Sequence, residues 1–179
     1  LREGEEHSYE AMVEMAAAAP AFGPLVSVED SRFLPPGDMC PRIRGFCEET
    51  GQTVPETKGG VLRCALESLA LEYRWVAERI DEVTGSRAGT IHIIGGGSKN
   101  ELLDQFTADA TGRTVVTGPV EATALGNVLV QAQALGDIGS VTEGREVIRR
   151  SFGLETYEPQ DSEAWDEAYA RYRVLRSRE

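Results

Sequence analysis

The residues best suited to bind a ligand form one short stretch, Gly95-Gly96-Gly97-Ser98-Lys99-Asn100. Glycines let a ligand approach the backbone closely, and Ser98 and Asn100 add small groups that donate and accept hydrogen bonds. The apolar residues before this stretch predict a strand, and the residues after it predict a helix. Open α/β sheets bind ligands at such a junction, although a tight connection without any ligand would use the same glycines.

Two familiar phosphate motifs are excluded at this position. The segment 95–99 lacks the Gly-x-x-x-x-Gly-Lys-[Ser/Thr] spacing of a P-loop. Asn100 stands where the third glycine of the dinucleotide fingerprint would be, so a Rossmann site is not expected either. From the residues alone, the prediction stops at a ligand-binding α/β unit.

The remaining polar candidates favour structural roles. His92 lies inside an apolar strand and is expected to be a core or helix-facing residue, and Glu121 opens a helix whose dipole favours a carboxylate. Ser98 does not fit the Gly-x-Ser-x-Gly nucleophile motif. No pair of aspartates has a spacing that suggests acid/base catalysis; the aspartates considered are Asp30, Asp38, Asp104 and Asp109.

The cysteines and histidines do not suggest a metal site. Cys40, Cys47 and Cys64 contain no Cys-x-x-Cys pair, and the two histidines lie far apart in the sequence, so no structural zinc is expected. Cys47 and Cys64 fall in adjacent helical stretches. They could face one another, or they could be buried as small hydrophobic residues, as is usual in a cytosolic chain.

Several helices and two strands must position the glycine stretch. The first helix begins after Ser8 and stops at Pro20, a proline-rich loop continues to Pro41, and a short helix ends at Gly51. The strongest helix pattern runs from about Glu56 to Thr84. The later predictions are a buried strand at 90–94, a helix at 100–111, a strand at 114–117, helices at 122–135 and 141–150, a loop at 153–159 and a charged terminal helix. Only two parallel strands are convincing, so the predicted sheet is incomplete.

Composition excludes several classes of protein. The chain has 179 residues, of which 41% are hydrophobic and 27% charged, as in one ordinary globular domain. Its net charge of −12 repels nucleic acid and anionic lipid. Its apolar runs are far shorter than the roughly 20 residues that span a bilayer. The opening residues 1–6 show no secretory pattern, so a cytoplasmic protein is expected, and the start at Leu1 suggests a fragment.

The longer motifs around the glycines resemble the FGGY family of sugar kinases. The resemblance covers about residues 9–159 and is carried by 91–103, Thr107-Ala108-Asp109-Ala110-Thr111-Gly112 and Gly118-Pro119-Val120-Glu121-Ala122-Thr123-Ala124-Leu125-Gly126-Asn127. Within the family, the stretches 32–34, 66–75 and 151–157 look most like the rhamnulokinases.

This resemblance implies an α/β fold of the actin-like ATPase (ribonuclease H-like) class, present as an incomplete, helix-rich fragment with a short parallel sheet. Residues 1–179 would be the C-terminal part of the nucleotide-binding domain, and the N-terminal domain and the first strands would be absent. Gly96 would pack beneath the adenosine of ATP and Asn100 would reach the adenine edge, while the turn is completed by Gly95, Gly97 and Ser98.

The implied reaction transfers the γ-phosphoryl group of ATP, with Mg²⁺ bridging the phosphates, to the 1-hydroxyl of L-rhamnulose. The catalytic aspartate and most sugar contacts would lie upstream, so no catalytic or metal-binding residue is expected in this chain, and the fragment alone would be inactive. Cys47 and Cys64 resemble a cysteine pair of some rhamnulokinases. Two alternatives remain: a related kinase acting on fuculose, xylulose or glycerol, and a nucleotide-binding module without catalysis.

Overall fold

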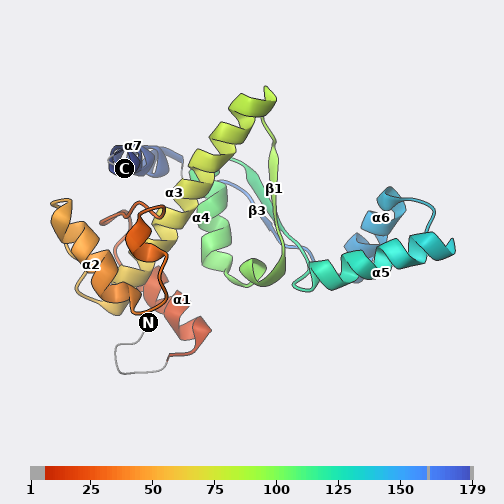
Figure 1. The fold of residues 1–179 in the computed structure, drawn as a ribbon, viewed down its shortest axis with the longest axis horizontal. Helices are drawn as coiled ribbons and strands as arrows, with labels where there is room; N and C mark the ends of the chain where they lie inside the picture. The colour runs from red at the N-terminus through yellow and green to blue at the C-terminus, as the bar shows by residue number, and fades with distance from the viewer. Residues whose placement is uncertain (1–6, 161, 178–179) are drawn as a thin grey trace.

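The computed structural model describes residues 7–160 and 162–177, so the opening residues discussed above lie outside it. Helices make up most of this part of the chain, and Figure 1 shows them around a small sheet. The elements are, in order, α1 (Tyr9–Ala18), η1 (Ser31–Phe33), α2 (Met39–Glu49), α3 (Lys58–Thr84), β1 (Thr90–Ile93), η2 (Gly95–Lys99), α4 (Glu101–Thr111), β2 (Thr114–Thr117), α5 (Ala122–Leu135), α6 (Val141–Ser151), β3 (Thr156–Tyr157) and α7 (Ser162–Arg176).

Local capping explains where the helices begin and end. The side chains of Ser8, Asp38 and Thr57 accept hydrogen bonds from backbone N–H groups at the starts of α1, α2 and α3. Because Thr57 is the cap, α3 begins at Lys58 and not at Glu56. Gly85 ends α3 with φ 68°, a left-handed conformation that favours glycine.

The sheet has the strand order β1-β2-β3. β1 and β2 are parallel, as predicted, with Thr90 opposite Thr114 and Ile93 opposite Thr117. The expectation of a purely parallel sheet is wrong, because β3 pairs antiparallel to β2 within the segment 153–159 that was expected to be a loop. Two residues are too few to show the alternation that identifies a strand.

β1 is an edge strand among the described residues, and this corrects two expectations. It was predicted to be a buried strand with His92 as a core or helix-facing residue, but Thr90 and His92 are exposed, so His92 is not in the core, and Ile94, just after the strand, is 60% exposed. α4 covers only one face of the sheet, where Val115 is fully buried (Figure 1). His92 lies on the other face, beside Val116 in the lining of an open groove.

The hydrophobic core lies away from the sheet, where α2, α3, α4 and α7 meet. Its largest fully buried side chains include Trp165 and Tyr172 of α7 and Leu71 of α3. The proline-rich loop closes one side of this core, because Leu25 and Val26 are buried and the Val26 N–H donates to Ser68 Oγ at 2.9 Å. The loop therefore caps the core, and it contributes no side chain to the glycine turn.

α5 and α6 project away from the rest of the molecule (Figure 1). α5 contains no buried residue, and its apolar residues Val128 and Leu135 are 61% and 79% exposed. Gly144 is the one buried residue of α6, against Leu129 of α5. The two helices therefore gain little from tertiary burial, which normally supplies most of the stability of a helix.

We expect the amides of α5 and α6 to exchange with solvent deuterium much faster than those of α3. Local opening is favoured where few apolar side chains are buried, as in α5 and α6, whereas α3 packs against α1, α2, α4 and α7. Hydrogen exchange read by mass spectrometry would measure the difference. Equal protection of α5 and α3 would contradict this expectation.

Candidate functional site

The glycine stretch forms a tight turn directly after β1. It folds as the 3-10 helix η2, and Gly95 enters it with φ 76°, which a residue with a side chain adopts only under strain. Ser98 Oγ donates to Gly95 O at 2.7 Å, and the Asn100 N–H donates to Gly97 O at 3.1 Å. The predicted strand, glycine turn and helix are thus found in that order, and hydrogen bonds between residues of the turn stabilise it.

The turn is also tied to the loop that follows β2. The Gly118 N–H donates to Ile93 O at 2.6 Å, and the Gly95 N–H donates to Pro119 O at 3.3 Å. A Cβ on Gly118 would lie 2.7 Å from Ile94 Cγ2, so glycine permits this close approach. The carboxyl ends of the two parallel strands therefore form one connected surface.

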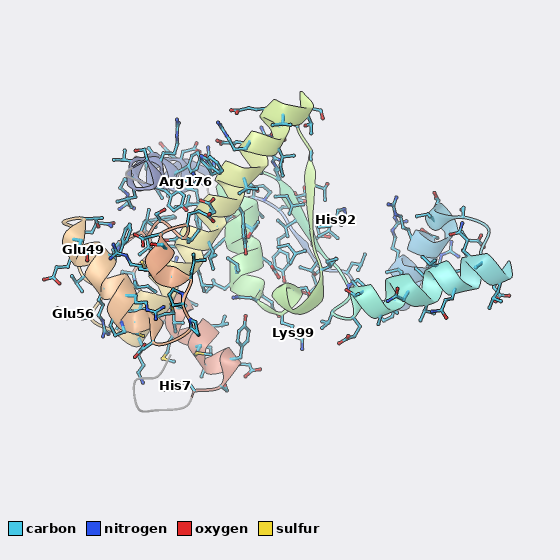
Figure 2. All side chains as sticks on the ribbon, viewed as in Figure 1. His7, Glu49, Glu56, His92, Lys99 and Arg176 are labelled. Carbon is cyan, nitrogen blue, oxygen red and sulfur yellow. The ribbon has the colours of Figure 1, made fainter. Side chains whose placement is uncertain are left out.

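Gly96 and Gly97 present bare backbone to solvent. Both are exposed, a Cβ on Gly96 would meet no atom within 4 Å, and one on Gly97 would meet only Ile93 Cγ2 at 3.4 Å. Figure 2 shows Lys99 pointing outward at the end of the turn. The space above Gly96 is open, so a flat ligand could lie directly on the peptide groups.

Asn100 combines the turn with the start of α4. It is only 7% exposed, and its Oδ1 accepts the Leu103 N–H at 3.1 Å, which makes it the N-cap of the helix. The oxygen thus has a structural role, whereas the Asn100 amide nitrogen has no hydrogen-bond partner among the described residues and can donate to a ligand. The sequence prediction had assigned Asn100 a ligand contact without this capping role.

A groove of about 440 Å³ lies beside the turn. Its lining includes Ser98, the loop 117–121 and the side chain of Phe152. Three carboxylate residues also line it, namely Glu101, Glu121 and Glu155. Carboxylates accept hydrogen bonds and repel anions, so this groove favours a neutral or hydrogen-bond-donating part of a ligand over a phosphate group. Glu121 opens α5, as predicted, but its side chain makes no capping hydrogen bond.

Of the four aspartates considered from the sequence, three have structural partners. Asp30 caps η1 and pairs with Arg32, Asp38 caps α2, and Asp109 Oδ1 accepts from Gln105 Nε2 and the Gln160 N–H. Asp104 is buried, and neither of its carboxylate oxygens has a hydrogen-bond partner. Sequence reasoning missed this feature, because burial of an aspartate leaves no signal in the pattern of residues.

The three cysteines are free and buried. The thiol of Cys64 interacts with that of Cys47, which raises the pKa of Cys64 and lowers that of Cys47. The two residues do face each other, which is one of the alternatives that the sequence left open, and their thiols are not joined by a disulfide in this structure. Among residues 7–160 and 162–177, no group of three or more His, Cys, Asp or Glu side chains could hold a metal ion. No helix in this part of the chain is long and apolar enough to cross a membrane.

Comparison with known proteins decides the family. Residues 1–135 match the family model described as the C-terminal domain of the FGGY family of carbohydrate kinases. The chain belongs to the FGGY carbohydrate kinases. This confirms the resemblance that the motifs around the glycine turn indicated.

Several curated proteins that are similar to this FGGY chain are rhamnulokinases. The rhamnulokinase of Bacteroides thetaiotaomicron is 46% identical over 93% of the chain, and that of Enterococcus faecalis is 42% identical over 88%. These matches cover 34% and 33% of the two relatives. The FGGY chain therefore spans about a third of the length of the curated relatives that it matches.

Solved FGGY kinases share its fold. The xylulose kinase of Rhodospirillum rubrum superposes with a TM-score of 0.70 at 21% identity, over 98% of this chain and 35% of that protein. The glycerol kinase of Plasmodium falciparum, solved with ADP, superposes with a TM-score of 0.66 at 14% identity, over 94% of this chain and 34% of that protein. The expected actin-like α/β class is confirmed, with the correction that the short sheet is mixed.

Proposed function

We propose that this chain is the C-terminal part of the nucleotide-binding domain of a rhamnulose kinase. The complete enzyme would transfer the γ-phosphoryl group of ATP to the 1-hydroxyl of L-rhamnulose and give L-rhamnulose 1-phosphate. The relatives named rhamnulokinase, up to 46% identical among those compared above, support the substrate. The bare backbone at Gly96 is the structural observation that carries the nucleotide-binding part of the proposal.

The adenosine would lie on Gly96 and Gly97, within the site formed by Gly95, Gly96, Gly97, Ser98 and Asn100. A flat base needs a surface without side chains, and the amide nitrogen of Asn100 could donate to an acceptor on the base edge. The carboxylates of the neighbouring groove disfavour phosphates there, so the triphosphate would extend away from Glu101 and Glu155. Magnesium would arrive with ATP, and we assign it no ligand in this chain.

The rest of the kinase would complete the sheet and the cleft. β1 has a free edge among the described residues, and the apolar stripe of α3 is open toward its end, with Ile80 and Val83 54% and 87% exposed. Upstream strands that pair with β1 would cover such surfaces. The catalytic aspartate and the sugar contacts would also come from upstream, and an enzyme of this kind would act in the cytoplasm.

A coupled assay on the complete polypeptide that contains this chain tests the reaction. With ATP and Mg²⁺, we expect the highest kcat/KM for L-rhamnulose in a panel with L-fuculose, xylulose and glycerol. Preference for another sugar would leave the proposed kinase activity standing but would contradict the proposed substrate. Nucleotide binding without turnover of any sugar would favour the non-catalytic module.

Replacing Gly96 with valine tests the nucleotide site. Because Gly96 is exposed and a Cβ added there would meet no atom within 4 Å, the fold should tolerate Gly96→Val, whereas the added methyl groups would collide with a bound base. We expect the KM for ATP to rise roughly 10- to 100-fold, with the KM for the sugar nearly unchanged.

Gly45→Val is the matched control, because Gly45 on α2 also has no atom near its missing Cβ and lies in an element that contributes nothing to the turn. Its KM for ATP should match that of the wild type. An unchanged KM for ATP in Gly96→Val would show that the adenosine of ATP does not bind at this turn.

A further inference from the structure

Asp104 is a buried carboxyl group without a hydrogen-bond partner. Its side chain is on the fourth residue of α4, it is 1% exposed, and both of its oxygens lack a partner. The other fully or nearly fully buried acidic side chains are satisfied: Glu67 pairs with Arg63, and Glu72 pairs with Arg176. An ionised carboxylate left unpaired in the interior is strongly disfavoured. Asp104 therefore differs from Glu67 and Glu72, because no partner stabilises its ionised form.

The groups that act on Asp104 increase this penalty. Glu101 lies one turn earlier on α4, and Glu155 lies just before β3. Tyr73 of α3 and Tyr157 of β3 also interact electrostatically with Asp104 but are neutral phenols, and the Tyr157 hydroxyl donates to Glu155 Oε2 at 2.7 Å. Burial first, and then the negative charges of Glu155 and Glu101, raise the pKa of Asp104 to about 6. Neither carboxylate nor phenol supplies the positive charge that would offset ionisation.

Asp104 lies in the first turn of α4, which follows the glycine turn in the sequence. Its backbone N–H donates to Asn100 O at 2.9 Å, in the same turn of α4 that the Asn100 side chain caps. Glu101 and Glu155, the two carboxylates that oppose its ionisation, also line the groove beside the turn. A charge appearing on Asp104 would therefore act on both the helix start and the strand β3.

We infer that the contact between the first turn of α4 and the β3 segment is a proton-sensitive latch, closed when Asp104 carries a proton and loosened when the proton leaves. The folded protein holds this proton more tightly than the unfolded chain does. Its contribution to stability is therefore fully present below about pH 4 and is lost as the pH rises through about 6. The latch needs no nucleotide, so it does not depend on the proposed kinase function.

Hydrogen exchange at a series of pH values between 4 and 8 tests the latch in the full chain. After correction for the intrinsic pH dependence of exchange, we expect the opening equilibrium of the amides at 101–107 to rise by up to about 100-fold across this range. In Asp104→Asn this rise should disappear, because the amide cannot ionise. Asp109→Asn is the matched control on the same helix, and it should keep the rise because Asp109 already has partners.

Two results would overturn the inference. One is the same pH dependence in the wild type and in Asp104→Asn. The other comes from the wild type alone, and so does not require the variant to fold: a carbon-13 NMR titration of the Asp104 carboxyl group with a midpoint near that of an exposed aspartate. A midpoint close to 6 together with a flat Asp104→Asn profile would support the latch.

Discussion

Replacing Trp165 with alanine is expected to lower the free energy of unfolding by about 4 kcal/mol. Trp165 of α7 is 2% exposed, and its ring lies 5.2 Å from the rings of both Phe22 and Phe106, measured between centroids. These contacts join the loop after α1 to α4 and α7. Alanine would leave a cavity where these three segments meet.

Urea unfolding followed by circular dichroism would measure this loss. Trp165→Phe keeps an aromatic ring at the site, and we expect it to recover more than half of the stability lost in the alanine variant. A loss below about 1 kcal/mol in Trp165→Ala would mean that α7 is not part of the cooperative core.

Glu67→Ala is expected to lower the free energy of unfolding by about 3 to 5 kcal/mol, because it would leave buried partners of the carboxylate without a hydrogen-bond acceptor. The Glu67 side chain is fully buried, accepts the Phe22 N–H at 3.0 and 3.1 Å, and pairs with Arg63 Nε at 2.6 Å. Phe22 is the one non-glycine residue with positive φ among the described residues, at 54°. The carboxylate thus holds a strained turn in place, and the Phe22 ring packs nearly perpendicular to Trp165, at an interplanar angle of 86°.

Chemical unfolding of two further variants separates the causes. Glu67→Gln keeps an acceptor for Phe22 but loses the charge opposite Arg63, so its cost should be smaller than that of alanine. Glu146→Ala removes the exposed ion pairs with Arg149 and Arg150 on α6 and should change stability by less than about 1 kcal/mol. Equal losses in Glu67→Ala and Glu146→Ala would show that burial does not set the strength of the Glu67 contacts.

The sequence predicted the glycine turn and the parallel strands beside it, since their signals are local. A β-branched run, three glycines and an asparagine at the helix start act over a few residues. These signals indicate β1, η2, α4 and β2 without reference to the rest of the chain. The strand β3 was missed, because its two residues are ordered by pairing with β2, a contact between distant parts of the sequence.

The buried face of α3 does not follow the apolar spacing that indicated the helix. Leu62, Leu66, Tyr73 and Ile80 belong to that apolar pattern, but the buried residues of α3 include Val61, Cys64, Glu67, Ser68, Leu71 and Glu72. Polar side chains are buried there because Arg63, Arg176 and backbone N–H groups satisfy them. Such partners come from other elements, so hydrophobic periodicity cannot reveal them.

The sequence predicted where the candidate site lies, but it did not predict which charged groups surround it. Glycines mark the turn in the sequence, whereas the acidic groove combines Glu101, Glu121 and Glu155 from three separate segments. Likewise, the orphaned carboxyl of Asp104 follows from how α4 packs against α3 and β3. Glu155 comes close to Glu101 and Asp104 only through the fold, so local spacing does not reveal that it is near them.

The open edge of β1 also determines how this polypeptide would behave when produced on its own. A strand edge with unpaired backbone groups is a template for the edge of another molecule, and the exposed Ile94 beside it adds an apolar contact. The net charge of −12 opposes such self-association through repulsion between molecules. Added salt screens this repulsion, so the solubility of the separate polypeptide falls as ionic strength rises.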